Sequence, residues 1–129
     1  MIMKIMAGDE MIAFLADASD VQEGTHPLTD PAWPLQMLMM KRGKGHVFVK
    51  HTHTPIPRSV PRMQEVIVVT KGKLLCTICD VQGTDIGSYE VSAGQCIFSA
   101  RCGIKVEVLE DTEFYEFKNG PHVEDKVLL

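Results

Sequence analysis

Apolar and polar residues alternate in short runs along most of the chain, and turn-forming residues separate the runs about every ten positions. Alternation with a period of two is typical of strands with one buried face, and regularly spaced short strands are typical of an antiparallel sandwich or small barrel. The pattern therefore predicts an all-β fold. The predicted strands cover residues 45–51, 64–70, 73–80, 87–92, 94–100, 104–110 and 112–118.

The first forty residues are less regular. Residues 1–8 predict a strand, and residues 10–17 predict a second strand or a short helix. Residues 23–36 carry three prolines within eight positions, which predicts a loop, and we expect Trp33 to hold this loop against the body. Residues 35–43 predict one more strand.

Length and composition indicate a single folded domain. The chain has 129 residues, enough for one core and too few for two. Hydrophobic residues make up 45% and charged residues 23%, which argues against disorder. We expect one domain over residues 1–129, made of N-terminal strands, an arm and a loop (1–40), a β-barrel (41–120) and a C-terminal tail (121–129), irregular or a short strand.

The charge pattern limits the partners. The net charge is -4 and no run of lysine and arginine exceeds two residues, so the basic face of a nucleic-acid-binding protein is not expected. Asp9, Glu10 and Asp17 interrupt the apolar N-terminus, and no apolar run approaches a signal peptide core or a membrane-spanning helix of about 20 residues. We therefore expect a cytoplasmic protein without a membrane partner.

The cysteines are interpreted as packing residues. Cys76 and Cys79 have C-x-x-C spacing, which redox and zinc motifs share. They lie, however, in a predicted strand, where positions three apart point to opposite faces. Cys96 and Cys102 have no C-x-x-C partner, so all four thiols are expected to pack as small apolar groups.

Two histidines and one glutamate form a candidate metal site. If residues 45–51 are a strand, His51 and His53 lie on one face together with the valines before them, and Glu65 likewise shares its face with Ile67 and Val69. A carboxylate inside an apolar barrel is costly unless a cation neutralises it. Two histidines and a carboxylate on one side of a metal suit Fe(II). The H-x-H pattern alone is weak, and a solvent-facing histidine pair before a loop is the alternative.

The spacing around these residues resembles a known family. Gly45, His51, His53, Glu65 and Gly72 follow the first motif of the cupin superfamily, G-x5-H-x-H, a short gap, then E-x6-G. The gap before Glu65 is eleven residues instead of three or four, an insertion that loop-closure entropy makes inexpensive. The resemblance implies a cupin-type double-stranded β-helix, a jelly-roll β-sandwich or barrel, with extra N-terminal strands.

The second motif of that family, G-x5-P-x-G-x2-H-x3-N, is incomplete here. Gly94 opens it, but Ala100 stands at the proline position and the histidine position holds Lys105, or Ile104 if the register shifts by one. Alternation with the valines at 106 and 108 indicates that Ile104 points inward and Lys105 outward. The interior is therefore expected to offer three ligands and an apolar patch where the fourth would stand.

The resemblance covers about residues 35 to 127. Within the superfamily, the chain resembles a group of small single-domain cupins whose members are often encoded among genes for surface polysaccharide or sugar-nucleotide metabolism. It implies a homodimer that acts on or binds a small polar metabolite, carbohydrate-derived compounds being one class, and leaves open whether the protein is an enzyme. In one interpretation His51, His53 and Glu65 hold a divalent metal ion such as Fe, Mn, Ni or Zn. In a second, another side chain supplies the fourth ligand: Cys96, Cys102 or His122. In a third, the protein is a metal-free binding module without enzymatic activity.

Overall fold

The computed structural model describes residues 2–129, and within this range every strand pair is antiparallel and no α-helix occurs. This confirms the all-β class that the sequence pattern predicts. No helix in the described part of the chain has the length and apolar character needed to cross a bilayer. The elements are β1 (Ile2–Ala7), β2 (Glu10–Asp17), a 3₁₀ turn η1 (Ala18–Asp20), β3 (Gly24–Pro27), β4 (Leu38–Lys41), β5 (Glu65–Lys71), β6 (Lys73–Cys79), β7 (Asp85–Ser92), β8 (Gln95–Ser99), β9 (Gly103–Val108) and β10 (Glu113–Lys118).

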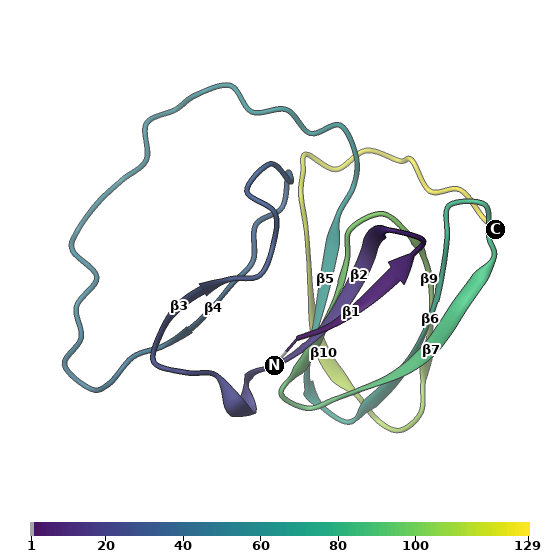
Figure 1. Ribbon diagram of the computed structural model, residues 1–129, viewed down its shortest axis with the longest axis horizontal. Helices are drawn as coiled ribbons and strands as arrows, with labels where there is room; N and C mark the ends of the chain where they lie inside the picture. The colour runs from purple at the N-terminus through teal and green to yellow at the C-terminus, as the bar shows by residue number, and fades with distance from the viewer. Residues whose placement is uncertain (1) are drawn as a thin grey trace.

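The strands form three separate sheets (Figure 1). The large sheet has the order β1-β2-β8-β5-β10, the small sheet has the order β7-β6-β9, and β3 and β4 form a hairpin of their own. The inner core lies between the large and the small sheet and combines residues such as Ile67, Val69 and Ile97 of the former with Leu74 and Ile78 of the latter. The result is an open two-layer sandwich, not a closed barrel.

The outer face of the large sheet is also covered. Phe14 on β2 and Phe98 on β8 are fully buried there, with parallel rings whose centroids lie 4.9 Å apart. Trp33 stacks on Phe98 at 5.8 Å, so the proline-containing loop is held to the body by its tryptophan, as the sequence predicts. The loop residues that pack against this second core are Leu28, Trp33, Leu35, Met37 and Met39.

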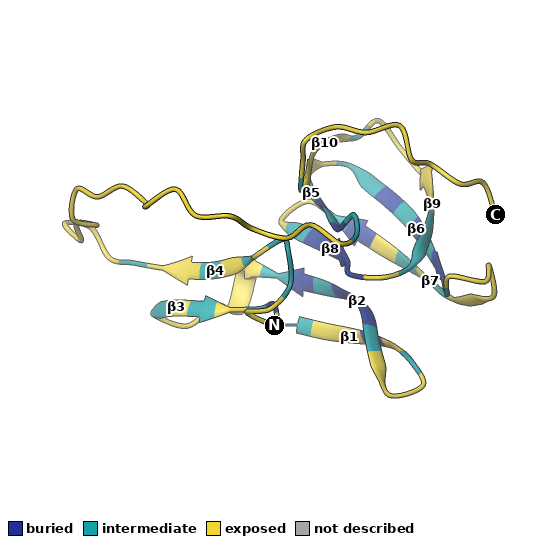
Figure 2. Cartoon of the chain, turned by 90° about the horizontal axis from the view of Figure 1, so that it is seen from above, coloured by how far each residue is buried: buried dark blue, intermediate teal, exposed yellow. Residues whose placement is uncertain are grey.

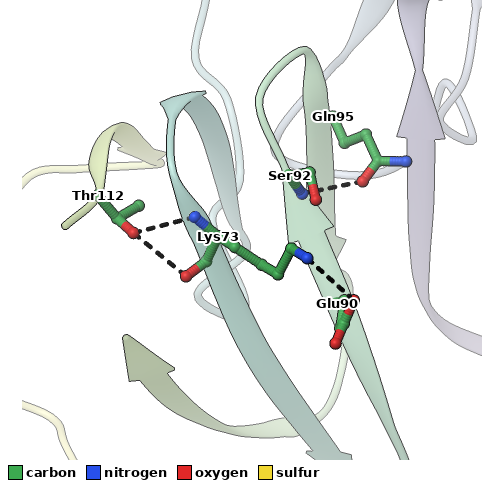
Figure 3. Close-up of polar contacts among 5 residues, drawn as sticks. All are labelled: Lys73, Glu90, Ser92, Gln95 and Thr112. Carbon is green, nitrogen blue, oxygen red and sulfur yellow. Dashed lines mark hydrogen bonds and ion pairs between the residues drawn. The ribbon is translucent and has the colours of Figure 1, made fainter. Parts of the chain in front are cut away.

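Gly72 and Thr112 bring the β5–β6 turn and the β9–β10 connection into contact. Gly72, between β5 and β6, has a φ of 88°, and a Cβ at this position would collide with the backbone at Asp111 and Thr112. The Thr112 hydroxyl accepts a hydrogen bond from the Lys73 N–H (3.0 Å) and lies 3.1 Å from the Lys73 carbonyl oxygen (Figure 3). These contacts hold the β9–β10 connection against β6.

The sequence prediction was wrong for two segments. Residues 45–51 form no strand; they belong to a segment, residues 42–64, that swings away from the sandwich before it returns to β5 (Figure 1). An alternating pattern produces a strand only where another edge supplies hydrogen bonds, and this segment has no such partner here. Residues 24–27, predicted as loop, form β3 because they pair with β4. Residues 10–17 form a strand, and the tail after residue 118 is irregular.

Candidate functional site

A pocket of about 430 Å³ opens at one end of the sandwich, where β5, β9 and β10 end or begin. Glu65, Ser99, Cys102, Ile104 and Lys118 line it from the strands and their connections. The C-terminal tail, residues 122–126, forms the remaining wall together with Met63. The pocket therefore combines an apolar side with carboxylate and ammonium groups, a composition suited to a small polar ligand.

Glu65 is placed in this pocket by strand register. It is the first residue of β5, opposite Ser99 of β8 and Lys118 of β10. Since side chains alternate, Glu65 lies on the same face as Ile67 and Val69, which belong to the inner core. This shared face is the one predicted from the sequence, and it directs the carboxyl group toward the space between the sheets.

Partial burial raises the pKa of the Glu65 carboxyl above its usual value, and the carboxyl of Glu116 raises it further by sharing a hydrogen bond with it. Glu116 lies opposite Ile67 on β10 and so shares the face of Glu65. Lys118 opposes the shift because its positive charge favours the ionised carboxylate. At the wall of the pocket Glu65 thus lies next to a second acidic group, Glu116, and to the ammonium group of Lys118.

A Glu65→Gln variant is expected to show a flatter decline in unfolding free energy as the pH rises above 4.5, the usual pKa of a glutamate. Because the native pKa is raised, the folded carboxyl keeps its proton where the unfolded one has lost it, so stability present at low pH is lost as the pH rises through the native pKa. Urea unfolding from about pH 4 to 8 in the presence of a chelator measures this slope. Glu110→Gln, at an exposed glutamate, is the control. An unchanged slope in Glu65→Gln contradicts the assignment.

The C-terminal tail is anchored beside Glu65 by Asn119. Its side-chain oxygen accepts a hydrogen bond from the Gln64 N–H (2.7 Å), and its amide nitrogen donates to the Arg62 carbonyl (3.0 Å). These two bonds fix the point where β10 ends and the tail begins. His122, three residues further on, consequently lies over the pocket, with its Nε2 3.7 Å from a carboxylate oxygen of Glu124.

The structure does not bring the predicted histidines to Glu65. His51 and His53 are exposed in the 42–64 segment, with ring centroids 5.3 Å apart, and His51 Nδ1 lies 2.7 Å from the Val49 carbonyl oxygen. Among residues 2–129, no group of three or more histidine, cysteine, aspartate or glutamate side chains is arranged to hold a metal ion. The conformation described here thus contains the carboxylate of the predicted triad in a pocket and the two imidazoles outside it.

Of the three residues considered as substitute ligands, two line the pocket and one belongs to the outer core. Cys102 and His122 line the pocket with Glu65. Cys96 belongs to the outer core with Phe14 and Phe98, so it faces away from the pocket. All four cysteines are free thiols, and burial raises the pKa of Cys76, Cys96 and Cys102 to about 11. Those three thiols are therefore protonated near neutral pH, in agreement with packing roles.

Ile104 occupies the opposite wall of the pocket. It packs against the inner core, whereas Lys105 is exposed, as the alternation predicts. Ser99 and Lys118 are pocket residues that the sequence reasoning missed. Their positions follow from cross-strand pairing with Glu65, so a correct register for β5, β8 and β10 is the signal that identifies them.

Comparison of the chain with family models, with curated proteins and with solved structures gives no match.

Proposed function

We propose that this chain is a cupin-type jelly-roll protein that binds a small polar metabolite, carbohydrate-derived compounds being the first class to test, in the pocket around Glu65. The observation that carries the proposal is the composition of that pocket. Glu65, the carboxylate of the first cupin-like motif, and Ile104, at the position of the second motif's histidine, line the same space although they belong to different sheets. Two motif positions that the resemblance assigns to one site are therefore neighbours in space.

The free edge of β9 supports a jelly-roll arrangement. Among the described strands β9 pairs only with β6, and the small sheet has three strands, whereas a jelly roll distributes eight strands over two sheets. Val106 and Val108 of β9 share the inward face of Ile104 but are 37% and 60% exposed. An apolar row beside an unpaired edge indicates that another strand completes the sheet.

Residues 45–53 have the composition of that missing strand. Val47 and Val49 are 75% and 77% exposed in the 42–64 segment. An antiparallel pairing that sets Val47 opposite Val108 and Val49 opposite Val106 covers both rows and sets His51 opposite Ile104. In this proposed pairing His51 stands across the pocket from Glu65, and His53 follows on the same face.

The donor groups fit a divalent cation. Glu65 is partly buried and its carboxyl shares a hydrogen bond with the exposed carboxyl of Glu116, and a bound cation would favour the ionised form of both groups. In the proposed pairing His51, His53 and Glu65 would hold the metal, and such a site supplies Lewis-acid chemistry at positions left open for a ligand. Lys118 and Lys126, which line the pocket, would neutralise anionic groups of that ligand.

A metal-free binding module is the second candidate. Two observations favour it: no three-ligand group exists among residues 2–129 in this conformation, and Ile104 puts an apolar side chain where a fourth ligand is expected. In this candidate the pocket binds its metabolite through the charged and polar groups at its wall alone. Metal content distinguishes the two candidates directly.

Elemental analysis of protein purified without a histidine tag is the test. We expect near-stoichiometric Fe, Mn, Ni or Zn in the wild type and loss of the metal in His51→Ala and in Glu65→Ala, because each variant removes one of three ligands. His26→Ala is the matched control, since His26 lies on β3 and its Nε2 contacts the Gln22 carbonyl outside the pocket. Metal-free wild-type protein, or metal retained in both variants, rejects the metal site. A thermal-shift screen with nucleotide sugars then tests the ligand class in either case.

A further inference from the structure

β10 is an edge strand that is exposed along its whole length. Among the described strands it pairs only with β5, at one end of the large sheet, and all six of its residues are exposed (Figure 2). Three of them are aromatic: Phe114, Tyr115 and Phe117 are 43%, 63% and 54% exposed. An unprotected edge with large apolar side chains is a surface for pairing with another strand.

The two faces of β10 differ in chemistry. Glu116 and Lys118 lie on the side of Glu65, because they stand opposite Ile67 and Glu65 of β5. Tyr115 and Phe117 lie on the other side, with ring centroids 6.3 Å apart. The free edge of β10 is thus charged on the pocket side and aromatic on the outer side.

We propose that β10 pairs with β10 of a second copy of this chain in an antiparallel, twofold-symmetric arrangement centred on Phe117. In an antiparallel pair, residues that face each other point to the same side of the sheet. A twofold axis perpendicular to the sheet must therefore pass midway between one residue and the same residue of the partner, so that this residue faces its own counterpart. This condition leaves only a few registers to compare.

Charge complementarity selects the register. With the axis at Phe117, Glu116 lies opposite the partner's Lys118, and Lys118 lies opposite the partner's Glu116. An axis at Glu113, Glu116 or Lys118 sets like charges against each other, and an axis at Phe114 or Tyr115 leaves no opposite charges facing within the strand. On the outer side the Phe117 register brings the two phenylalanines together, with Tyr115 and the partner's Tyr115 flanking them.

The pairing has a consequence for the pocket. Glu116 is the residue whose carboxyl shares a hydrogen bond with Glu65, and Lys118 lines the pocket. In the paired state the partner's Lys118 faces Glu116, so each copy contributes a positive charge beside the Glu65–Glu116 pair of the other copy. The inference is independent of metal binding and holds for either candidate function.

Sedimentation velocity of the 129-residue chain tests the proposal. We expect the wild type to be a dimer, and we expect Glu116→Lys and Lys118→Glu each to raise the dimer dissociation constant by about tenfold, because two attractive pairs become repulsive. The double variant Glu116→Lys/Lys118→Glu restores opposite charges and is expected to recover wild-type dimerisation. Glu113→Lys is the matched control, as it makes the same charge change on the same strand away from either pair.

Circular dichroism of every variant separates loss of dimer from loss of fold. A monomeric wild type overturns the proposal, and so does a dimer that neither single charge reversal weakens. A folded double variant that stays monomeric also overturns it. A dimer that resists the β10 changes but dissociates in Val106→Lys assigns the interface to the edge of β9 instead.

Discussion

A Phe98→Ala variant is expected to lose about 3–5 kcal/mol of unfolding free energy, because truncation of a buried aromatic residue removes its contacts and leaves a cavity. The Phe98 side chain is fully buried between Phe14 and Trp33, with ring centroids 4.9 Å and 5.8 Å away. The substitution therefore weakens both the sheet and the attachment of the loop that carries Trp33. Urea unfolding followed by fluorescence of Trp33, the only tryptophan in the sequence, measures the loss.

Phe48→Ala is the matched control for this prediction. Phe48 is 58% exposed in the 42–64 segment, so its truncation is expected to change the unfolding free energy by no more than about 0.5 kcal/mol. A Phe98→Ala loss as small as that of the control would mean that the loop does not cover the outer face of the large sheet in solution.

A Gln64→Leu variant is expected to lose about 2–4 kcal/mol, because it leaves one buried and one partly buried backbone group without hydrogen-bond partners. Gln64 is completely buried. Its side-chain oxygen accepts a hydrogen bond from the Leu35 N–H (3.1 Å), and its amide nitrogen donates to the Ala100 carbonyl (3.2 Å). One amide thus joins the proline-containing loop, the start of β5 and the end of β8.

The control for Gln64 is Gln82→Leu, at an exposed glutamine in the connection between β6 and β7. Guanidinium unfolding of both variants at one pH gives the difference, and only the Gln64 variant is expected to be destabilised. Equal midpoints for the two variants would show that water or another side chain satisfies the groups around residue 64.

The sequence pattern predicted the strands that pair within the two main sheets but not the two segments whose state depends on partners elsewhere. The strand predicted at 64–70 corresponds to β5 and that at 94–100 to β8, because both are apolar and find neighbours on each side. Residues 45–51 also contain an apolar, β-forming run at positions 47–49, yet they are unpaired. Periodicity records which side chains favour burial, and it contains no information about whether an edge is available.

The candidate site was likewise predictable where it depends on a single strand and not where it depends on which strands pair. The inward face of Glu65 and the opposite orientations of Ile104 and Lys105 follow from alternation within single strands, and the structure agrees with both. Ser99 and Lys118 depend on register between strands that are distant in sequence, which a single sequence does not specify. The convergence of His51 and His53 with Glu65 stays a prediction, because it requires the pairing of residues 45–53 with β9.

The double covering of the large sheet has a consequence for how this sequence can change over time. Every residue of β8 from Cys96 to Ser99 is buried, since the inner core lies on one side and the loop with Trp33 on the other. In β7, by contrast, most side chains reach solvent. Neutral drift is therefore expected to accumulate in β7, whereas a viable change in β8 requires a compensating change in one of the two layers that enclose it.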